Sequence, residues 1–125
     1  MGRAKRNAKA GSRVVTWETV REIALKLPKV EEGKSYRTPA FRVGGQLFAR
    51  LHQDGDCVVV RIDPAERELR MAADPRAFFI TDHYLDYPWL LVRFSAVRKS
   101  DLRDLLGDAW RLAAPASLVD PFGND

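Results

Sequence analysis

Four arginines recur in stretches of the chain where apolar residues alternate with other types. They are Arg42, Arg50, Arg61 and Arg93. A guanidinium is planar, permanently charged and able to donate paired hydrogen bonds, so it suits phosphate groups. Phe48 stands two residues before Arg50, and an exposed ring beside such cations is typical of surfaces that stack nucleic-acid bases. These five residues form the first candidate site, although a one-faced sheet also shows arginine to water without any ligand.

A second group with chemical potential lies in one short segment and consists of His83, Tyr84, Tyr87 and Trp89. A histidine near its titration point among aromatic rings is typical of a pocket for a small ligand or a protein partner. The alternative is an aromatic plug that packs the segment over the edge of a sheet. Asp82 could support His83 as a base, but a nucleophile or metal partner is missing from the segment, so we expect no enzymatic activity.

Gly44–Gly45, inside the stretch FRVGGQLFARL, is either a phosphate-binding loop or a tight turn between strands. A P-loop needs a downstream Lys followed by Ser or Thr, and a dinucleotide fingerprint needs three spaced glycines that run into a helix. Here the glycines run into the alternating residues 46–51, which favour a strand. The pair therefore predicts a hairpin turn that fixes strand register and so decides which way Arg42 and Arg50 face.

The spacing of apolar residues predicts the elements that position these residues: a period of 3.6 indicates a helix and a period of 2 a strand. The order is a helix from the Thr16 cap to Pro28, strands around 41–43, 47–51 and 58–62, a helix that Asp63 begins, a turn or short helix that carries Phe78 and Phe79, a strand over 89–94, and a helix from the Ser100 cap to Pro115. We expect an α+β fold: a single antiparallel sheet, formed by a three-strand meander plus a later strand, with the N- and C-terminal helices packed on one face. The other face would then display the arginines.

The charge of the chain is concentrated at its start. Five of the 21 basic residues fall in the first 13 positions, which contain no acid, so 16 basic and 17 acidic residues remain. We expect residues 1–13 to be a disordered basic tail, in which Lys5, Arg6 and Lys9 attract phosphates. Residues 14–118 are expected to form one domain, and 119–125 a loose end.

The composition of the chain excludes several classes of protein. No apolar run reaches the ~18–20 residues that a membrane span needs, and the start lacks the apolar region of a secretory signal. Cys57 is the only cysteine, and with two histidines the chain shows no metal-ligand spacing. We expect a cytoplasmic protein without cofactor, metal or membrane contact, and a monomer is favoured.

The stretches PAFRVGGQLFARL and VVVRIDPAERELRMAADPRAFFITDHYLDYPWLLVRF resemble the MmcQ/YjbR family of small bacterial proteins. The resemblance covers about residues 14–114, and the basic N-terminal extension is not part of the family pattern. It implies a fold similar to the frataxin (CyaY) shape, described as a double-wing arrangement, whose members are commonly labelled DNA-binding. Iron binding of the frataxin kind is not expected, because Arg21 and Lys26 stand among the acids of the first helix.

The sequence therefore predicts a non-enzymatic binding module of the MmcQ/YjbR type. Its first ligand class is DNA or another nucleic acid, held by the arginine-bearing sheet face and the basic arm. The alternative is a protein-interaction or small-ligand module that uses the exposed sheet or the segment from His83 to Trp89.

Overall fold

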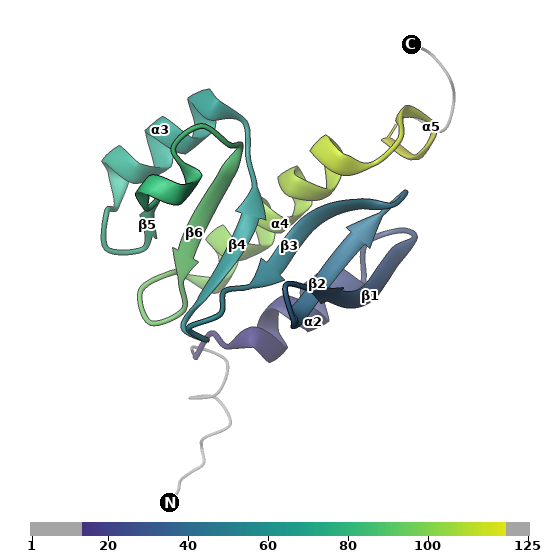
Figure 1. Ribbon diagram of the computed structural model, residues 1–125, viewed down its shortest axis with the longest axis horizontal. Helices are drawn as coiled ribbons and strands as arrows, with labels where there is room; N and C mark the ends of the chain where they lie inside the picture. The colour runs from purple at the N-terminus through teal and green to yellow at the C-terminus, as the bar shows by residue number, and fades with distance from the viewer. Residues whose placement is uncertain (1–13, 120–125) are drawn as a thin grey trace, which may run out of the picture.

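The computed structural model describes residues 14–119, which form a six-stranded antiparallel sheet with two helices on one face (Figure 1). The strands are β1 (Val30–Ser35), β2 (Thr38–Val43), β3 (Gln46–Leu51), β4 (Cys57–Arg61), β5 (Phe78–Phe79) and β6 (Trp89–Arg93), in the order β1-β2-β3-β4-β6-β5. The helices are α2 (Trp17–Leu25), α3 (Pro64–Ala73), α4 (Lys99–Ala113) and α5 (Ala116–Val119), with a short 3-10 helix η1 (Asp82–Tyr84). The expected α+β class is confirmed. The expected basic tail, with Lys5, Arg6 and Lys9, lies outside the described residues.

Capping residues and prolines mark the ends of the helices. The carboxylate of Asp63 accepts hydrogen bonds from the backbone N–H groups of Ala65 and Glu66, at 3.0 and 3.3 Å, and so caps α3. Pro64 follows that cap in the first turn, where its missing N–H costs nothing. Helix α4 begins at Lys99, with Arg98 at the cap position and no side-chain cap, so the prediction that Ser100 caps it is wrong; the helix ends ahead of Pro115, as expected.

The main core lies between the sheet and the helices α2 and α4. Its largest fully buried side chains include Phe41, Phe48, Leu90, Leu102 and Leu106. Trp17 of α2 stacks on Phe41 with 5.3 Å between the ring centroids. Burial of each such side chain stabilises the fold by roughly 1.5–3 kcal/mol, so this layer fixes which face of the sheet is covered. We call the opposite face the open face.

Two strands were missed by the sequence pattern. Strand β1 reads VEEGKS and is an edge strand with four exposed residues, so it has no apolar alternation to detect. Strand β5 was expected to be a turn or short helix, but Phe78 and Phe79 pair with β6 opposite Val92 and Leu91. The prediction of a turn or helix there is wrong, because two residues are too short to show a period.

The turn at Gly44–Gly45 is confirmed as a hairpin between β2 and β3, with φ of +58° and +80°. The register beyond it contains a bulge: Phe41 lies opposite Ala49 and Arg42 opposite Leu47, which leaves Phe48 without a partner. The bulge turns Phe48 as well as Ala49 into the main core. The prediction that Phe48 is displayed beside Arg50 is therefore wrong.

No helix within residues 14–119 combines the length and the apolar character needed to cross a membrane.

Candidate functional site

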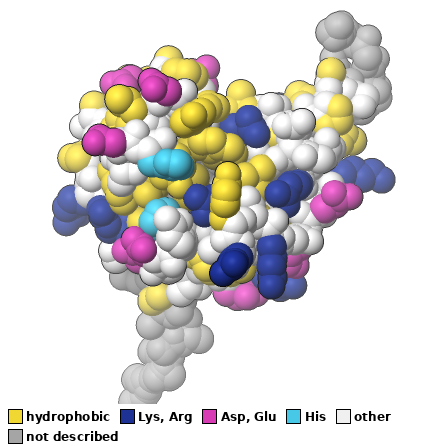
Figure 2. Space-filling model, viewed as in Figure 1, with side chains coloured by type: hydrophobic (Ala, Val, Ile, Leu, Met, Phe, Trp, Pro, Cys, Tyr) yellow, Lys and Arg dark blue, Asp and Glu magenta, His cyan; other side chains and the backbone are white. Residues whose placement is uncertain are grey.

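The strand register places all four predicted arginines on the open face, one from each of β2, β3, β4 and β6. Arg61 lies opposite Trp89, at one end of the β4–β6 pair, and Arg93 lies opposite Cys57, at the other. Arg50 occupies the middle, opposite Val59. Figure 2 shows this face, with hydrophobic side chains gathered at its centre and Lys and Arg side chains around them.

Among residues 14–119, no acidic side chain forms an ion pair with these four arginines. Within residues 14–119, the ion pairs closer than 4.0 Å involve Arg21, His52, Arg70, Arg76 and Arg98 as the cationic partners. In that part of the chain no carboxylate pairs with Arg42, Arg50, Arg61 or Arg93. Glu31 faces Arg42 across the β1–β2 ladder without reaching it. The open face therefore keeps local positive charge although residues 14–125 are close to neutral.

Aromatic rings and backbone carbonyls hold the outer arginines in place. The guanidinium of Arg61 lies 4.8 Å from the ring centroid of Trp89 and donates two hydrogen bonds to the carbonyl of Leu47, at 2.9 and 2.7 Å. The guanidinium of Arg93 lies 4.2 Å from the ring centroid of Phe79. Burial lowers the pKa of Arg61 from its ordinary value, but the guanidinium stays charged at neutral pH. Arg61 and Arg93 are therefore cations in fixed positions, and each keeps N–H donors that can bind a ligand.

Arg50 differs from the others because it is buried, with 6% of its surface exposed. Its Nη2 donates to the hydroxyl of Tyr84 at 2.7 Å and its Nη1 to the carbonyl of Leu51 at 3.3 Å. The ring of Tyr36 lies 5.2 Å away and covers the guanidinium. A buried cation without a carboxylate is costly unless acceptors surround it, so a ligand that offers acceptors gains by reaching Arg50.

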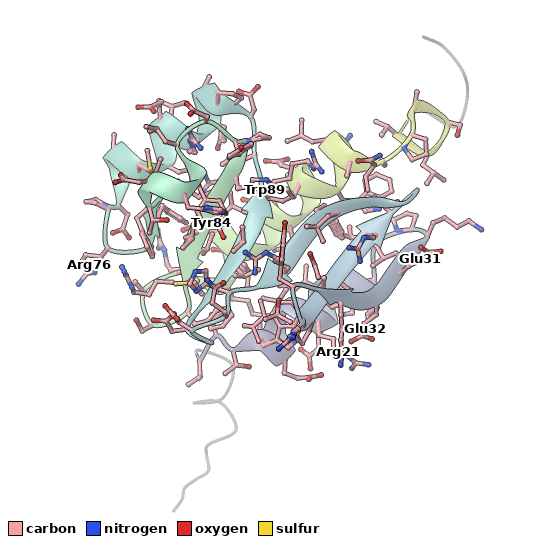
Figure 3. The ribbon with its side chains drawn as sticks, viewed as in Figure 1. Arg21, Glu31, Glu32, Arg76, Tyr84 and Trp89 are labelled. Atoms are coloured by element: carbon pink, nitrogen blue, oxygen red, sulfur yellow. The ribbon has the colours of Figure 1, made fainter. Side chains whose placement is uncertain are left out.

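Arg50 also lines a pocket of about 320 Å³ on the open face. The lining residues are Tyr36, Leu47, Arg50, Val59, His83, Tyr84, Tyr87 and Trp89. Figure 3 shows Tyr84 and Trp89 in front of β4 and β6, on the side away from α4. The fold thus brings the segment of the second predicted site over the central arginine of the first, and we call this the aromatic pocket.

A buried arginine of α3 fixes the loop wall of the aromatic pocket. Arg67 donates to the backbone carbonyls of Tyr84, Leu85, Tyr87 and Trp89, at distances from 2.7 to 3.1 Å. Tyr84 itself is 6% exposed and packs on Val59 and Leu91 in a second, smaller core. The segment is therefore partly a plug, as the alternative expected, while His83 and Tyr87 remain exposed. The rigid anchoring pre-forms one side of the pocket.

Sequence reasoning missed three pocket residues, Tyr36, Leu47 and Val59. The bulge at Phe48 places Leu47 on the same face as Val59, which strict alternation along β3 does not predict. Tyr36 sits in the β1–β2 turn, where its φ of +52° is unusual for a residue with a Cβ. A tyrosine between two short polar stretches was the only signal available.

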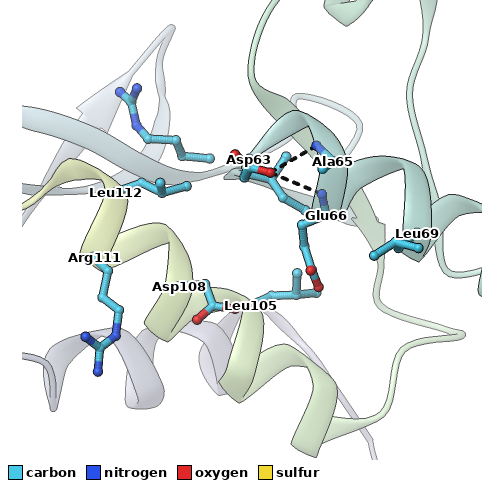
Figure 4. A pocket seen from close by; sticks show the side chains of 10 residues that line it. Asp63, Ala65, Glu66, Leu69, Leu105, Asp108, Arg111 and Leu112 are labelled. Atoms are coloured by element: carbon cyan, nitrogen blue, oxygen red, sulfur yellow. Dashed lines mark hydrogen bonds between the residues drawn. The ribbon is translucent and has the colours of Figure 1, made fainter.

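A second cavity of about 380 Å³ lies between α3 and α4 (Figure 4). Apolar side chains of Leu69, Leu105 and Leu112 line it, together with Asp63, Glu66, Asp108 and Arg111. Asp63 is already engaged as the cap of α3. Among the predicted site residues only Arg61 borders this cavity, so it is separate from the aromatic pocket.

His52, Asp54 and Asp56 bring three potential metal ligands within 4.8 Å of one another in the β3–β4 turn. The spacing of these three residues in the sequence is not typical of a metal site. The Nδ1 of His52 already accepts the N–H of Asp54 at 3.2 Å, and both aspartates are exposed. We assign no metal to the group.

These elements define an α+β protein built on one antiparallel sheet, with helices on one face and a pocket on the other. The YjbR family model matches residues 25–112, and the chain belongs to the YjbR family, as the resemblance implied. Uncharacterised proteins of Mycobacterium bovis and Mycobacterium tuberculosis are 31% identical to it over 127 residues, which cover 87% of this chain and 96% of theirs.

A solved structure shares the fold. The crystal structure of Deinococcus radiodurans protein DR2400, with a DUF419 domain, matches with a TM-score of 0.69 and 23% identity. The match covers 79% of this chain and 78% of that one. The likeness concerns the fold, so the function has to be argued from the open face itself.

Proposed function

We propose that this protein is a non-enzymatic module that binds DNA or another nucleic acid through its open face. The observation that carries the proposal is the set of four arginines, one from each of four strands, without an acidic partner among the described residues. Guanidinium groups held by carbonyls and rings are pre-oriented donors for phosphate oxygens. In this proposal Lys5, Arg6 and Lys9 add attraction that does not depend on nucleic-acid sequence.

The charge balance predicts the character of the binding. Because residues 14–125 hold 16 basic and 17 acidic side chains, no long-range positive field supports the open face. The contacts of a few arginines then supply the affinity, which falls as salt rises and cations compete for the phosphates.

The aromatic pocket supports a second candidate, a small-ligand module. Its volume of about 320 Å³ is at the low end of small-molecule sites, and it has apolar walls with one buried cation. Binding of a free small ligand in the pocket would depend less on salt than a chain of phosphate contacts does. The salt dependence of binding therefore separates the two candidates.

The test compares two charge-neutralising variants. Arg42 donates a single hydrogen bond within residues 14–119, to the carbonyl of Lys34 at 3.1 Å, so Arg42→Gln should leave the fold intact. Arg103→Gln is the matched control, because Arg103 is exposed on α4 and borders α2 on the helical face. Fluorescence anisotropy with labelled DNA over a salt series should show that Arg42→Gln weakens binding and lowers the salt slope by about 1. Equal behaviour of the two variants, or no binding at low salt, contradicts the proposal.

A further inference from the structure

We propose that the aromatic pocket is a site for one unpaired base of a nucleic-acid strand, with the neighbouring phosphates on Arg42 and Arg61. This inference rests on the proposed function and adds to it the ligand class: single-stranded nucleic acid rather than a duplex. Three features of the pocket carry it, namely its walls, its buried cation and the conformation of Tyr36.

The walls of the pocket suit a flat apolar ring. Tyr36 stands on one side, on the β1–β2 turn, and Tyr87 and Trp89 stand on the other, on the loop that Arg67 anchors. Leu47 and Val59 supply apolar surface from the sheet. Aromatic side chains on which bases stack are the usual means of holding single strands without reading their sequence.

The buried cation selects a ring that carries acceptors. Arg50 has five N–H donors, of which the protein engages one with Tyr84 and one with Leu51. The carbonyl oxygens of thymine, cytosine or guanine are acceptors of the right kind for the remaining donors. A purely hydrocarbon ligand would cover the remaining donors of Arg50 without offering them acceptors, which is unfavourable.

Arg42 and Arg61 are the arginines that would bind the phosphates next to the inserted base. Arg42 lies opposite Leu47 across the β2–β3 ladder, and Arg61 donates to the carbonyl of the same Leu47. The guanidinium of Arg61 therefore lies beside the end of the pocket that Leu47 lines, whereas that of Arg42 is directed toward β1, where it donates to the carbonyl of Lys34. A base inserted over Leu47 and Val59 would leave its backbone beside Arg61, with Arg42 farther along the same face.

Tyr36 adopts a conformation that costs stability and that function can explain. It and Arg37 occupy the two central positions of the β1–β2 turn with φ of +52° and +70°, where Gly or Asn is the usual choice. The side chain of Tyr36 is also 82% exposed, so burial does not compensate the backbone. Strain of this kind is commonly retained where a side chain serves a ligand. Here the turn holds the ring at the wall of the pocket.

A paired base does not fit this description. In a duplex each base is stacked on both faces and its pairing edge is occupied, so it cannot enter between Tyr36 and Trp89 without leaving the helix. A base in a single strand has both faces free. The pocket therefore favours single strands, whereas arginines alone would bind either form.

The test uses the full chain and three labelled probes of equal length, each of about ten nucleotides: oligo-dT, an abasic strand and a duplex. The main variant is Tyr36→Gly, which removes the ring and relieves the positive φ, so it should fold at least as stably as the parent. Tyr36→Phe is the matched control, because it keeps the ring. Circular dichroism and thermal unfolding verify that both variants are folded.

We expect oligo-dT to bind more tightly than the abasic strand or the duplex, and Tyr36→Gly to weaken oligo-dT binding about tenfold while abasic binding is unchanged. Tyr36→Phe should bind oligo-dT nearly as the parent does. If the duplex binds as well as oligo-dT and Tyr36→Gly has no effect, the pocket proposal is wrong while the proposed function stands. If none of the probes binds at low salt, the proposed function fails, and the pocket proposal fails with it.

Discussion

At the scale of single residues, two arginines show how the protein uses buried charge. Arg50 and Arg67 are 6% and 9% exposed, and neither has a carboxylate partner within residues 14–119. Arg67 donates from its two Nη groups to four backbone carbonyls and thereby shapes a loop, while its Nε is buried without a hydrogen-bond partner. Arg50 has fewer acceptors and faces the aromatic pocket. The first arginine is structural by this comparison, and the second keeps donors for a ligand.

Cys57 gives a prediction that pH can test. Burial, assisted by the nearby Asp56 carboxylate, raises the pKa of its thiol from 9.0 to about 12, because the thiolate is disfavoured there. The thiol is therefore protonated in the folded protein at pH 8, and alkylation by iodoacetamide should be much slower in the native state than in urea.

The same shift of the Cys57 pKa has a definite sign for stability. Between pH 9 and about 12 the unfolded chain releases the thiol proton and the folded chain retains it. The stability that this group contributes is thus complete below pH 9 and is lost as pH rises toward 12. Urea unfolding of the parent should show a steeper alkaline loss than Cys57→Ala does. Parallel curves for the two proteins would contradict the assigned pKa shift.

At the scale of elements, sequence periodicity recovered helices α2, α3 and α4 and strands β2, β3, β4 and β6, but not β1, β5 or the bulge. Strict alternation placed Phe48 on the same side as Arg50, and the unpaired position in β3 moved Phe48 into the core. A bulge depends on how two strands pair, so a single strand's pattern does not contain it. Arg61 was predicted on the correct face because it lies in a regularly paired stretch, and Arg42 because the extra residue of the bulge is in β3, so that β2 itself alternates regularly.

The β2–β3 hairpin gives a prediction about close packing between elements. Gly44 has a φ of +58°, and a Cβ placed there would meet Cδ of Pro115, just after α4, at 2.9 Å. Gly45 has a φ of +80° with open space around it. Gly45→Ala should cost about 1 kcal/mol of unfolding free energy, from the backbone alone. Gly44→Ala should cost clearly more, because Pro115 has to shift. Equal losses in urea unfolding would show that the contact with Pro115 is unimportant.

At the scale of the whole molecule, the aromatic pocket depends on topology. Strand β6 inserts beside β4 although α3, β5 and η1 intervene in sequence, and this brings the segment from His83 to Trp89 over the centre of the sheet. Residue types alone identified the arginines of the strands and the segment from His83 to Trp89 as candidates for binding. Their convergence required the strand order, which no local pattern encodes.

The division of charge between residues 1–13 and the rest leads to the last prediction. A variant that lacks residues 1–13 loses five positive charges but none of the described core, of which Val15 is the first member. It should therefore unfold at the same temperature as the parent. Its salt slope for single strands should fall by up to about 3.5, since each of five lost phosphate contacts removes roughly 0.7.

The truncation also shows whether residues 1–13 and the aromatic pocket contribute to binding independently. Distant sites usually contribute additively, so Tyr36→Gly should weaken oligo-dT binding by the same factor in the truncated chain as in the full chain. Anisotropy titrations of the four proteins, at one salt concentration where all bind measurably, provide the comparison. If the truncation alone removes binding while Tyr36→Gly and Arg42→Gln have no effect in the full chain, the ligand is held by the N-terminal segment. The open face would then have to be assigned to a different partner.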